Sequence, residues 1–544
     1  MDRISRRDAL VLLVVLGTGV FLAGLELMIT AVALPAIVTD LATWTRLREA
    51  SWIINGYLLV YIVTMPVAGR LADLYGARRL FLWSLVIFTL GSLLAGAAPT
   101  LELLIAARLV QAIGGGALVP VATSAASHLF TGPSRPRALG VVGALTFLGM
   151  AAGPVLGAAI LGALHPEAAL SRLGIEPTSG LYGFLAPAWR WVFYVNVPVG
   201  ISAFVLAWAA SSGWETPRRQ GRVDLIGAVL FSAFLVGSLG SLTLLGSQAG
   251  ADDTGLDPAT IARVLGVVAV VAGPVTILRG LRTTDPFLDP RLFRSASFSS
   301  ASLVSLLTGY GFATAIVGAA VFVDRVLYGG PDEQRLALGA LAGATALGAL
   351  LSGFAVRVLS LKVVTLAGIG MSIAGLVQMA GWTPETTIES AALSLALFGG
   401  GFGLTVTPRS TAAVEAVKVE AYGIASSTVT VARMVGMAIG LAILTAYGST
   451  TIDRLYDQVY ATADAYLQYI PEALRDRPLR DGLVVEALEQ WAASEAARIM
   501  VGIFLVAAVV TAVAIPPSLL LGRRRRMLAP DGPPEHEPVP VPEP

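Results

Sequence analysis

The sequence predicts an all-α polytopic membrane protein, and three observations support this fold class. Of the 544 residues, 55% are hydrophobic and 13% are charged, a composition far more apolar than that of soluble globular domains. The apolar residues form about fourteen runs, each near or above the roughly 20 residues that a helix needs to cross a bilayer. Arginines gather in alternate loops between these runs, as the positive-inside rule describes for membrane proteins.

The predicted crossings follow the apolar runs in order. The first six are expected near residues 11–37, 49–69, 80–98, 101–127, 137–163 and 190–211. Two more are expected near 223–246 and 258–279. The last six are expected near 298–327, 335–357, 362–382, 388–409, 421–448 and 498–521. The first run is longer than the core of a signal peptide, so we interpret it as an uncleaved first helix.

Arginine positions predict the orientation in the membrane. An even number of crossings places both chain ends on one side, and the arginine-rich loops lie on that side. These loops include Arg78 with Arg79, Arg135 with Arg137, and Arg218, Arg219 and Arg222. We therefore expect both termini in the cytoplasm and the protein in the inner (cytoplasmic) membrane. Residues 523–544, which begin with four arginines and continue rich in proline and glutamate, are expected to form a disordered cytoplasmic tail.

Composition also excludes several function classes. The chain has no cysteine, which rules out disulfides and thiolate chemistry, and its three histidines favour neither a metal site nor a histidine proton relay. The two lysines, Lys362 and Lys418, lack the glycines of a phosphate-binding loop, so ATP-driven pumping by this chain alone is not expected. We expect no enzyme activity, no cofactor and no nucleic-acid binding. A proton gradient is the remaining power source, at roughly 2.3 kcal/mol per charge for each 100 mV.

An internal repeat divides the chain into two halves. The stretch that begins at Gly69 has a degenerate copy beginning at Gly353, 284 positions later, and Gly153 has a counterpart in Gly436, 283 positions later. We expect a first six-helix half over 1–212, two inserted helices over 213–296, and a second six-helix half over 297–522 with an outer loop over 450–498. Many transporters are built from such halves, with the substrate site near the midplane between them.

A short charged turn joins the second and third crossings. Its pattern is Gly-X-X-X-Asp followed by Gly-X-Arg-Arg, and its residues are Gly69, Arg70, Asp73, Gly76, Arg78 and Arg79. The turn is too short to leave the membrane surface, so Asp73 lies among helix ends, where it can bind arginines and helix N-termini. We interpret it as a conformational latch; the alternative is a loop that only sets topology. The copy has Arg357 in place of Asp73, so a latch of this kind is expected in the first half only.

This charged pattern resembles the loop between the second and third helices of the major facilitator superfamily of secondary transporters. The resemblance implies a major facilitator fold, with alternating access between two six-helix halves. The stretches 189–200 and 285–293 resemble the fourteen-helix drug:proton antiporter subfamily. We interpret the aromatic residues of the first of these stretches as an interfacial belt.

Glu26 lies near the middle of the first predicted helix. A carboxylate in hydrocarbon costs several kcal/mol, so Glu26 should face a cavity or be protonated much of the time. The surrounding stretch, 25–35, resembles the first-helix motif of the fourteen-helix antiporters, which usually have aspartate where this chain has Glu26. The resemblance implies that Glu26 carries the coupled proton. The alternative is a glutamate satisfied by a neighbouring helix.

Two arginines deep in predicted helices need partners of opposite charge or a water-filled space. Arg108, with Gln111, lies in a stretch that resembles the fourth-helix motif of the superfamily, whose arginine is thought to influence protonation of a nearby acid; the alternative is a purely structural tie. Arg433 has Glu26 or Asp324 as candidate partners. We assign Glu26, Arg108, Arg433 and Asp324 to proton coupling, although Asp324 and its neighbour Arg325 fit an interface pair or outer gate better than a substrate site.

Glycines and a proline mark the fifth predicted helix. The residues are Gly149, Gly153, Pro154 and Gly157. Glycines four apart let a helix pack closely against another, and proline permits a bend. With Pro154 directly after Gly153, the pattern resembles the fifth-helix motif of exporting antiporters, which favours export over uptake.

Few charges line the predicted helices, which favours hydrophobic or amphiphilic cargo. The substrate cavity is expected to include Glu26, Gln111, Asn55, Tyr57 and Tyr310. The predicted function is proton-coupled export of hydrophobic compounds, most simply multidrug efflux. The alternatives are export of lipids or lipid-like metabolites, proton-driven uptake, and a receptor with a transporter fold. The loop 450–498 could dock an external protein or be a passive connector, and a monomer is expected.

Overall fold

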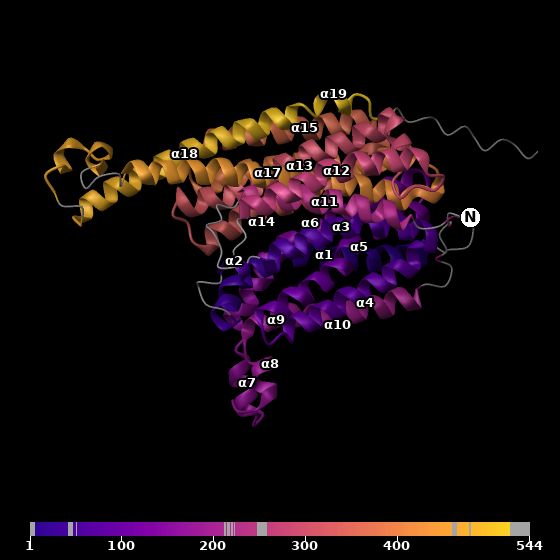
Figure 1. Ribbon diagram of the computed structural model, residues 1–544, viewed down its shortest axis with the longest axis horizontal. Helices are drawn as coiled ribbons and strands as arrows, with labels where there is room; N and C mark the ends of the chain where they lie inside the picture. The colour runs from indigo at the N-terminus through magenta and orange to yellow at the C-terminus, as the bar shows by residue number, and fades with distance from the viewer. Residues whose placement is uncertain are drawn as a thin grey trace, which may run out of the picture.

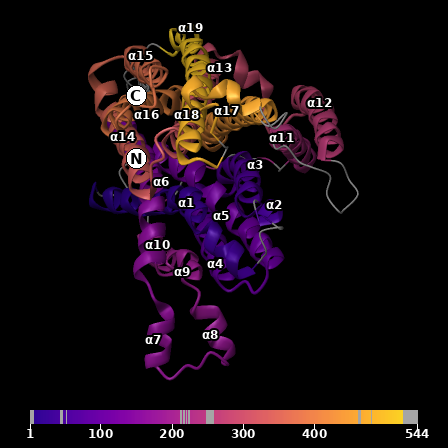
Figure 2. The ribbon, with the colours of Figure 1, turned by 90° about the vertical axis from the view of Figure 1, so that its left-hand side faces the viewer.

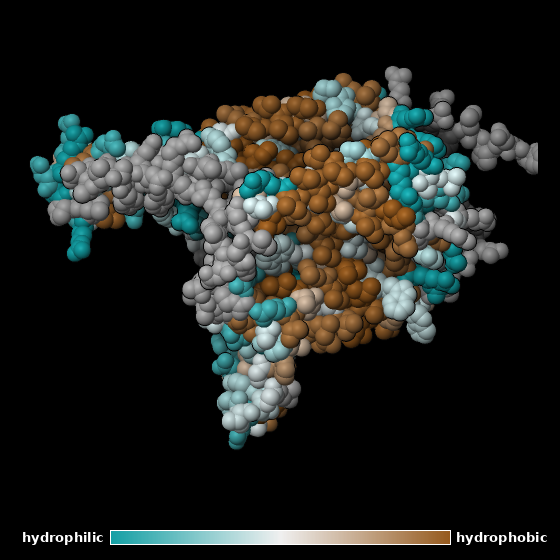
Figure 3. All heavy atoms as spheres, viewed as in Figure 1, coloured by the Kyte–Doolittle hydropathy of each residue, from teal (hydrophilic) through white to brown (hydrophobic). Residues whose placement is uncertain are grey.

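The computed structural model describes residues 6–41, 47–50, 52–210, 214, 218, 221, 224–246, 258–459, 465–477 and 480–522. Within these residues the secondary structure is helical, and 14 helices are long and apolar enough to cross a membrane. On the face shown in Figure 3, hydrophobic residues cover the middle of the bundle, and hydrophilic residues lie at its two ends. The predicted fold class and the number of crossings are confirmed. The predicted tail, 523–544, lies outside the described residues.

The first half contains six crossings. They are α1 (Arg6–Leu41), α3 (Trp52–Tyr75), α4 (Ala77–Gly96), α5 (Leu101–Leu129), α6 (Arg135–Ala163) and a sixth made of α9 (Ala188–Tyr194) and α10 (Asn196–Ala209). The short helix α2 (Leu47–Ala50) precedes α3. Two further short helices, α7 (Pro166–Arg172) and α8 (Gly180–Leu185), project from one end of the bundle (Figure 1).

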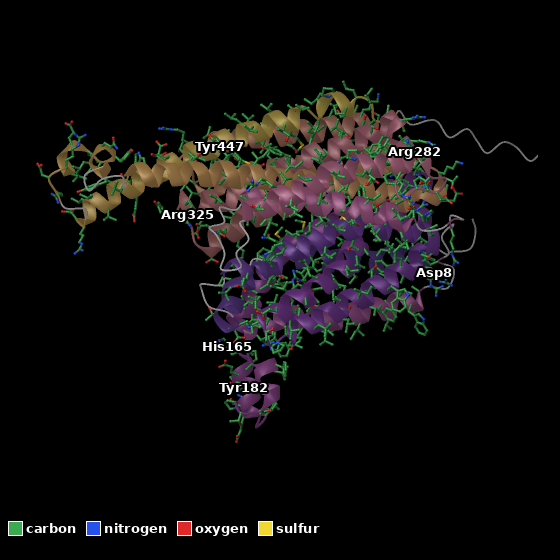
Figure 4. The ribbon with its side chains drawn as sticks, viewed as in Figure 1. Asp8, His165, Tyr182, Arg282, Arg325 and Tyr447 are labelled. Atoms are coloured by element: carbon green, nitrogen blue, oxygen red, sulfur yellow. The ribbon has the colours of Figure 1, made fainter. Side chains whose placement is uncertain are left out.

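Two inserted helices and the second half follow. The inserted helices are α11 (Leu225–Gly246) and α12 (Pro258–Arg282). The crossings of the second half are α13 (Ala296–Arg325), α14 (Pro331–Val358), α15 (Leu361–Met379), α16 (Ile388–Glu415), α17 (Tyr422–Val459) and α18 (Gly482–Ala512). The short α19 (Ile515–Ser518) ends the described helices. In Figure 4, Asp8 and Arg282 lie at one end of the bundle, and His165 and Arg325 lie at the other.

The two halves pack their helices in the same way. In the first half α6 lies along α1, and in the second half α17 lies along α13. Both contacts depend on glycines, because Gly153 lies against the backbone of α1 and Gly436 lies against the carbonyl of Leu306 on α13. A side chain at either position would push the helices apart. The glycine pair detected in the sequence therefore marks equivalent helix contacts in the two halves.

The inserted helices lie beside the bundle, and α11 contacts α3 and α17, one helix from each half (Figure 2). Asp224, just before α11, links α11 to α12 and to the segment that follows α12. Its carboxylate accepts hydrogen bonds from Nη2 of Arg279 at 2.7 Å and from the backbone of Gly227 and Phe287. Burial raises the pKa of Asp224, but these hydrogen bonds outweigh that effect and hold the pKa below its usual value.

The helices α17 and α18 run well beyond the rest of the bundle and project together from one end (Figure 1). The crossing expected at 421–448 is therefore part of a longer helix, and the one expected at 498–521 starts within α18, which begins at Gly482 and ends at Ala512. The segment 450–498 therefore includes the outer end of α17 and the first part of α18. Between the helices, Tyr469 packs on Trp491 of α18, with 4.4 Å between ring centroids.

Candidate functional site

Glu26, on α1, has no exposed surface. Its Oε1 pairs with Nη1 of Arg108 on α5 and accepts the hydroxyl of Thr30 at 2.9 Å. Its Oε2 accepts the side-chain amide of Asn196, at the start of α10, at 2.7 Å. Both oxygens thus have donors, and a guanidinium matches the negative charge. An ionised carboxylate needs these contacts in an apolar interior.

Arg108 connects Glu26 to two other residues predicted at the site. Its Nη1 also donates to Oε1 of Gln111 at 2.6 Å, and its guanidinium lies 4.0 Å from the centroid of the Tyr57 ring. Its Nε donates to the backbone carbonyl of Ile53 at 3.3 Å. The side chain is 1% exposed. The structure therefore brings Glu26, Arg108, Gln111 and Tyr57 together in one buried network within the first half.

Sequence reasoning missed three members of this network: Thr30, Ser92 and Asn196. The hydroxyl of Ser92 on α4 accepts Nε2 of Gln111 at 3.0 Å and Nδ2 of Asn196 at 3.1 Å. Asn196 is a polar residue inside an apolar run, which is a usable signal, and Thr30 lies one helical turn after Glu26. Nothing in the sequence distinguishes Ser92 from other helix serines. The network therefore includes residues of α1, α4, α5 and α10.

The glycine pattern of α6 lies directly against the helix that carries Glu26. A Cβ on Gly153 would come within 2.8 Å of the Cβ of Met28 and 3.0 Å of the carbonyl oxygen of Leu25. Gly149 lies even closer to the α1 backbone, at the carbonyl of Phe21. Gly157 continues this face against Ile29, and Pro154 lines a narrow cavity beside Met28. Movement of α6 along this contact would act on the helix that holds the carboxylate.

Asp73, near the end of α3, contacts the opposite half. Its Oδ1 accepts the backbone N–H of Gly423 at 2.7 Å, and its Oδ2 accepts that of Ile424 at 2.9 Å. Both amides belong to the first turn of α17, where backbone N–H groups have no partner within the helix. The positive end of the helix dipole adds to the attraction. We call this the Asp73 contact, and it closes the two halves against each other at this end of the bundle.

Close backbone packing accompanies the Asp73 contact. A Cβ on Gly69 would lie 2.5 Å from the carbonyl oxygen of Gly423, so only glycine fits there without movement. Gly76 joins α3 to α4 with a φ of 93°, a conformation that glycine adopts without strain. The other residues of the predicted latch lie nearby, with different exposure: Arg70 is buried, Arg78 is half-buried and Arg79 is exposed.

Other predicted site residues are not among the hydrogen-bond and ion-pair partners of Glu26. Asn55 is half-buried on α3, and Tyr310 is buried on α13 in the second half. Asp324 pairs with its neighbour Arg325 at 3.1 Å, and these side chains are 52% and 74% exposed. Such an exposed pair contributes little to stability. Asp324 therefore does not join the buried network in this structure.

Arg433, on α17, has neither of its candidate partners. Glu26 pairs with Arg108, and Asp324 pairs with Arg325. Among the described residues, Arg433 forms no ion pair with a carboxylate, and its buried Nε has no hydrogen-bond partner. Its guanidinium lies 5.4 Å from the ring centroid of Phe147 on α6. Arg433 thus faces the first half across the boundary between the halves.

The aromatic stretch at the start of the sixth crossing is a structural tie, so its interpretation as an interfacial belt is wrong for Trp189. This side chain is buried and donates from Nε1 to Asp40 at 2.9 Å. The neighbouring Arg190 donates to the carbonyls of Gly96 and Ala98 at 2.8 and 2.7 Å, where α4 ends. The sequence pattern did not reveal these polar partners.

Two similarly packed six-helix halves, with a charged network buried in one of them, define a polytopic membrane transporter. A family profile for the Major Facilitator Superfamily matches residues 16–441. The chain belongs to this superfamily, and it is a transporter rather than an enzyme.

Two named relatives are similar to this chain over most of its length. A triacylglyceride transporter of Mycolicibacterium hassiacum is 31% identical over 444 residues, which are 79% of this chain and 78% of the relative. The multidrug resistance protein B homologue of Mycobacterium tuberculosis is 30% identical over 450 residues, which are 81% of this chain and 76% of the relative.

Solved structures share the fold. The human organic anion transporter MFSD10 has a TM-score of 0.57 and 13% identity, with 92% of this chain and 99% of that chain covered. The proton:xylose symporter XylE has a TM-score of 0.55 and 11% identity, with 94% and 97% covered. At these identities the similarity establishes the major facilitator fold alone.

Proposed function

We propose that the protein is a proton-coupled exporter of hydrophobic or amphiphilic compounds that works by alternating access. The observation that carries this proposal is the carboxylate of Glu26, which is fully buried yet held by Arg108, Thr30 and Asn196. A buried ionisable group inside a membrane helix is costly and is usually retained for function. Relatives named as multidrug resistance proteins and triacylglyceride transporters support the class of cargo.

Glu26 exchanges the proton in this mechanism. Protonation neutralises the charge that Arg108 and Asn196 are arranged around, which leaves the Arg108 guanidinium without a counter-charge. Arg108 then depends on Gln111, whose Oε1 is already 2.6 Å away. This change loosens α1 from α5 and α10, and α6 follows because its glycines lie on α1. Proton binding is thereby linked to rearrangement within the first half.

The Asp73 contact sets which end of the transporter is open. In the structure this end is closed, and we assign it to the cytoplasmic side from the arginine distribution. Release of substrate to the outside would occur from this closed-inside state. Breaking two charge-assisted hydrogen bonds is required before the inner end opens. The fifth-helix pattern of Gly153 and Pro154 favours export as the direction of transport.

An efflux assay tests this proposal. Proteoliposomes with the full chain are loaded with a lipophilic dye, and efflux is followed with and without an imposed proton gradient. We expect gradient-dependent efflux by the wild type and none by Glu26→Gln. Glu389→Gln, which changes an exposed glutamate in the first turn of α16, is the matched control and should behave as wild type. Equal efflux by Glu26→Gln and the wild type would refute a coupling role for Glu26.

Export of lipids is the second candidate, and the projection of α17 and α18 favours it (Figure 1). Lipids leaving the membrane need an apolar path past its surface, which paired long helices could provide. Replacing the projecting parts of α17 and α18 by a short flexible connection distinguishes the two cargoes. Loss of triacylglyceride export with retained dye export would favour lipids. Unchanged lipid movement would leave the projection a passive connector.

A further inference from the structure

Two arginines of the second half lie in the bundle without an acidic partner in the part of the chain that the structure describes. Arg409 on α16 is 2% exposed, and Arg433 on α17 is half-buried with a fully buried Nε. Neither forms an ion pair with a carboxylate of the described residues. Moving a guanidinium from water into an apolar interior costs several kcal/mol unless a partner compensates it. These two side chains therefore need an explanation that the protein's own carboxylates do not supply.

The two guanidinium groups flank one aromatic cluster. Arg409 lies 5.3 Å from the ring centroid of Phe402, and Arg433 lies 5.4 Å from that of Phe147. These two rings meet edge to face, with 5.6 Å between centroids. Phe147 belongs to α6 of the first half, so the cluster lies on the boundary between the halves.

The hydrogen bonds that the structure shows for these donors go to neutral groups. Arg409 donates to the hydroxyl of Thr308 at 2.6 Å and to a carbonyl of its own helix, both neutral groups. Tyr61 belongs to α3 of the first half, which packs against the α17 helix of Arg433, and its buried hydroxyl has no hydrogen-bond partner. These donors come from both halves, and none of them contacts a carboxylate among the residues that the structure describes.

Charge balance points the same way. Glu26 neutralises Arg108, whereas neither Arg409 nor Arg433 has a neutralising carboxylate among the described residues. Arg433 lies about 15 Å along α17 from Gly423, at about 1.5 Å per residue, and so is well separated from the Asp73 contact. A ligand with one negative charge could bind both guanidiniums and the Tyr61 hydroxyl.

Apolar surface adjoins these donors. The Phe312 ring stacks on Phe402 with 4.5 Å between centroids. Phe312 also lines a narrow cavity of about 30 Å³ between the halves, together with Met28, Met150 and Ile316. This space holds about one water molecule in the closed conformation, and it shows where an apolar chain could enter when the halves separate.

We propose that Arg409, Arg433 and Tyr61 form a binding site for the anionic headgroup of an amphiphile, whose apolar part lies along the cluster of Phe147, Phe312 and Phe402. This inference rests on the proposed function and narrows its substrate class. Amphiphiles with a carboxylate, sulfonate or phosphate are preferred over neutral ones, and lipophilic cations are disfavoured. The ligand contacts both halves, as alternating access requires of a substrate.

Equilibrium binding tests the site without any transport step. The full chain in phosphatidylcholine nanodiscs is titrated with three fluorescent probes: dansylamino-undecanoic acid, its methyl ester, and the corresponding trimethylammonium compound. Empty nanodiscs provide the background. We expect the acid to bind at least about tenfold more tightly than the ester, because hydrogen bonds to charged groups are the stronger kind. Equal affinity for the acid and the ester would overturn the proposal.

Substitutions test whether the residues of the proposed site cause the preference for the acid over the ester. Arg433→Gln should abolish the difference between acid and ester while leaving ester affinity unchanged, and Arg433→Lys should retain it in part. Tyr61→Phe should reduce acid binding alone, by about two- to tenfold. Arg357→Gln, which removes an exposed arginine of the same half, is the control. Retention of the full preference by Arg433→Gln would contradict the site, and the acid-to-ester ratio of the wild type remains decisive if a variant fails to fold.

The outcome for the anion site can be distinguished from the outcome for proton-coupled export. Gradient-driven efflux with no preference for the acid would refute the anion site and leave proton-coupled export standing. A clear preference for the acid, without gradient-driven movement of any probe, would support the anion site and refute proton-coupled export.

Discussion

The carboxylate of Asp73 on α3 accepts the backbone N–H of Gly423 on α17, with 2.7 Å between oxygen and nitrogen. This bond crosses the boundary between the halves and joins a side-chain charge to the first turn of a helix. In the degenerate repeat of the second half, Arg357 stands in place of the acid and is exposed. The Asp73 contact is therefore asymmetric, with one carboxylate joining the two halves at one end of the bundle.

Asp73→Asn should open this end more often. The substitution removes the negative charge and one of the two acceptors for the amides of Gly423 and Ile424. Each hydrogen bond to a charged group is worth about 1.5–3 kcal/mol, so we expect the open fraction to rise about tenfold or more. Because the chain has no cysteine, spin labels at Thr131→Cys and Arg357→Cys report the distance between the halves uniquely. Asp332→Asn, at an exposed ion pair, should leave that distance distribution unchanged.

Gly69→Ala tests the same contact by sterics rather than charge. The added methyl would lie 2.5 Å from the carbonyl oxygen of Gly423, so the two helices must separate. We expect longer distances between the same pair of spin labels. Gly339→Ala on α14 adds a methyl with no atom within 4 Å and should have no effect. An unchanged distance distribution in Gly69→Ala would show that the contact is looser than the structure has it.

Arg108→Gln should destabilise the first half. It leaves the buried carboxylate of Glu26 without a counter-charge, and breaking a buried ion pair from one side typically costs about 3–5 kcal/mol. The double variant Glu26→Gln/Arg108→Gln has no unpaired charge and should unfold at a higher temperature than Arg108→Gln alone. Thermal unfolding in detergent measures both. Equal or lower stability of the double variant would contradict the ion pair as the reason for the loss.

The pH dependence of stability should include a contribution from Asp224. Hydrogen bonds hold its pKa below the usual value in the folded protein. Such a group stabilises the fold above its unfolded pKa of about 3.9, and the contribution disappears as pH falls through the folded pKa. We expect Asp224→Asn to melt a few degrees below the wild type at pH 7, and the difference to shrink below about pH 4. A difference that does not change with pH would exclude the charge as its cause.

Hydrophobic runs and arginine distribution predict the crossings because both properties follow from the bilayer itself. Helix ends were less predictable. The run expected at 421–448 continues to Val459, since polar residues outside the membrane extend a helix without any hydropathy signal. The glycines Gly153 and Gly436 were informative because close helix contact leaves no room for a side chain.

The buried network around Glu26 was also only partly predictable from the sequence. A lone carboxylate such as Glu26 is conspicuous in an apolar helix, and so is Arg108. Their pairing depends on the relative rotation of α1 and α5, which no spacing in the sequence encodes. By charge alone, Arg433 and Arg108 were equally suitable partners for Glu26, yet in the structure Glu26 pairs with Arg108. Ser92 contributes through a position that any small helix residue could have occupied.

The most direct measurement of the central claim is proton movement itself. Proteoliposomes that enclose a pH-sensitive dye are given a lipophilic substrate on one side, and the internal pH is followed for the wild type, Glu26→Gln and the control Glu389→Gln. Proton-coupled export predicts a substrate-dependent pH change in the wild type and the control, and none in Glu26→Gln. A substrate-dependent pH change that persists in Glu26→Gln would contradict Glu26 as the proton carrier.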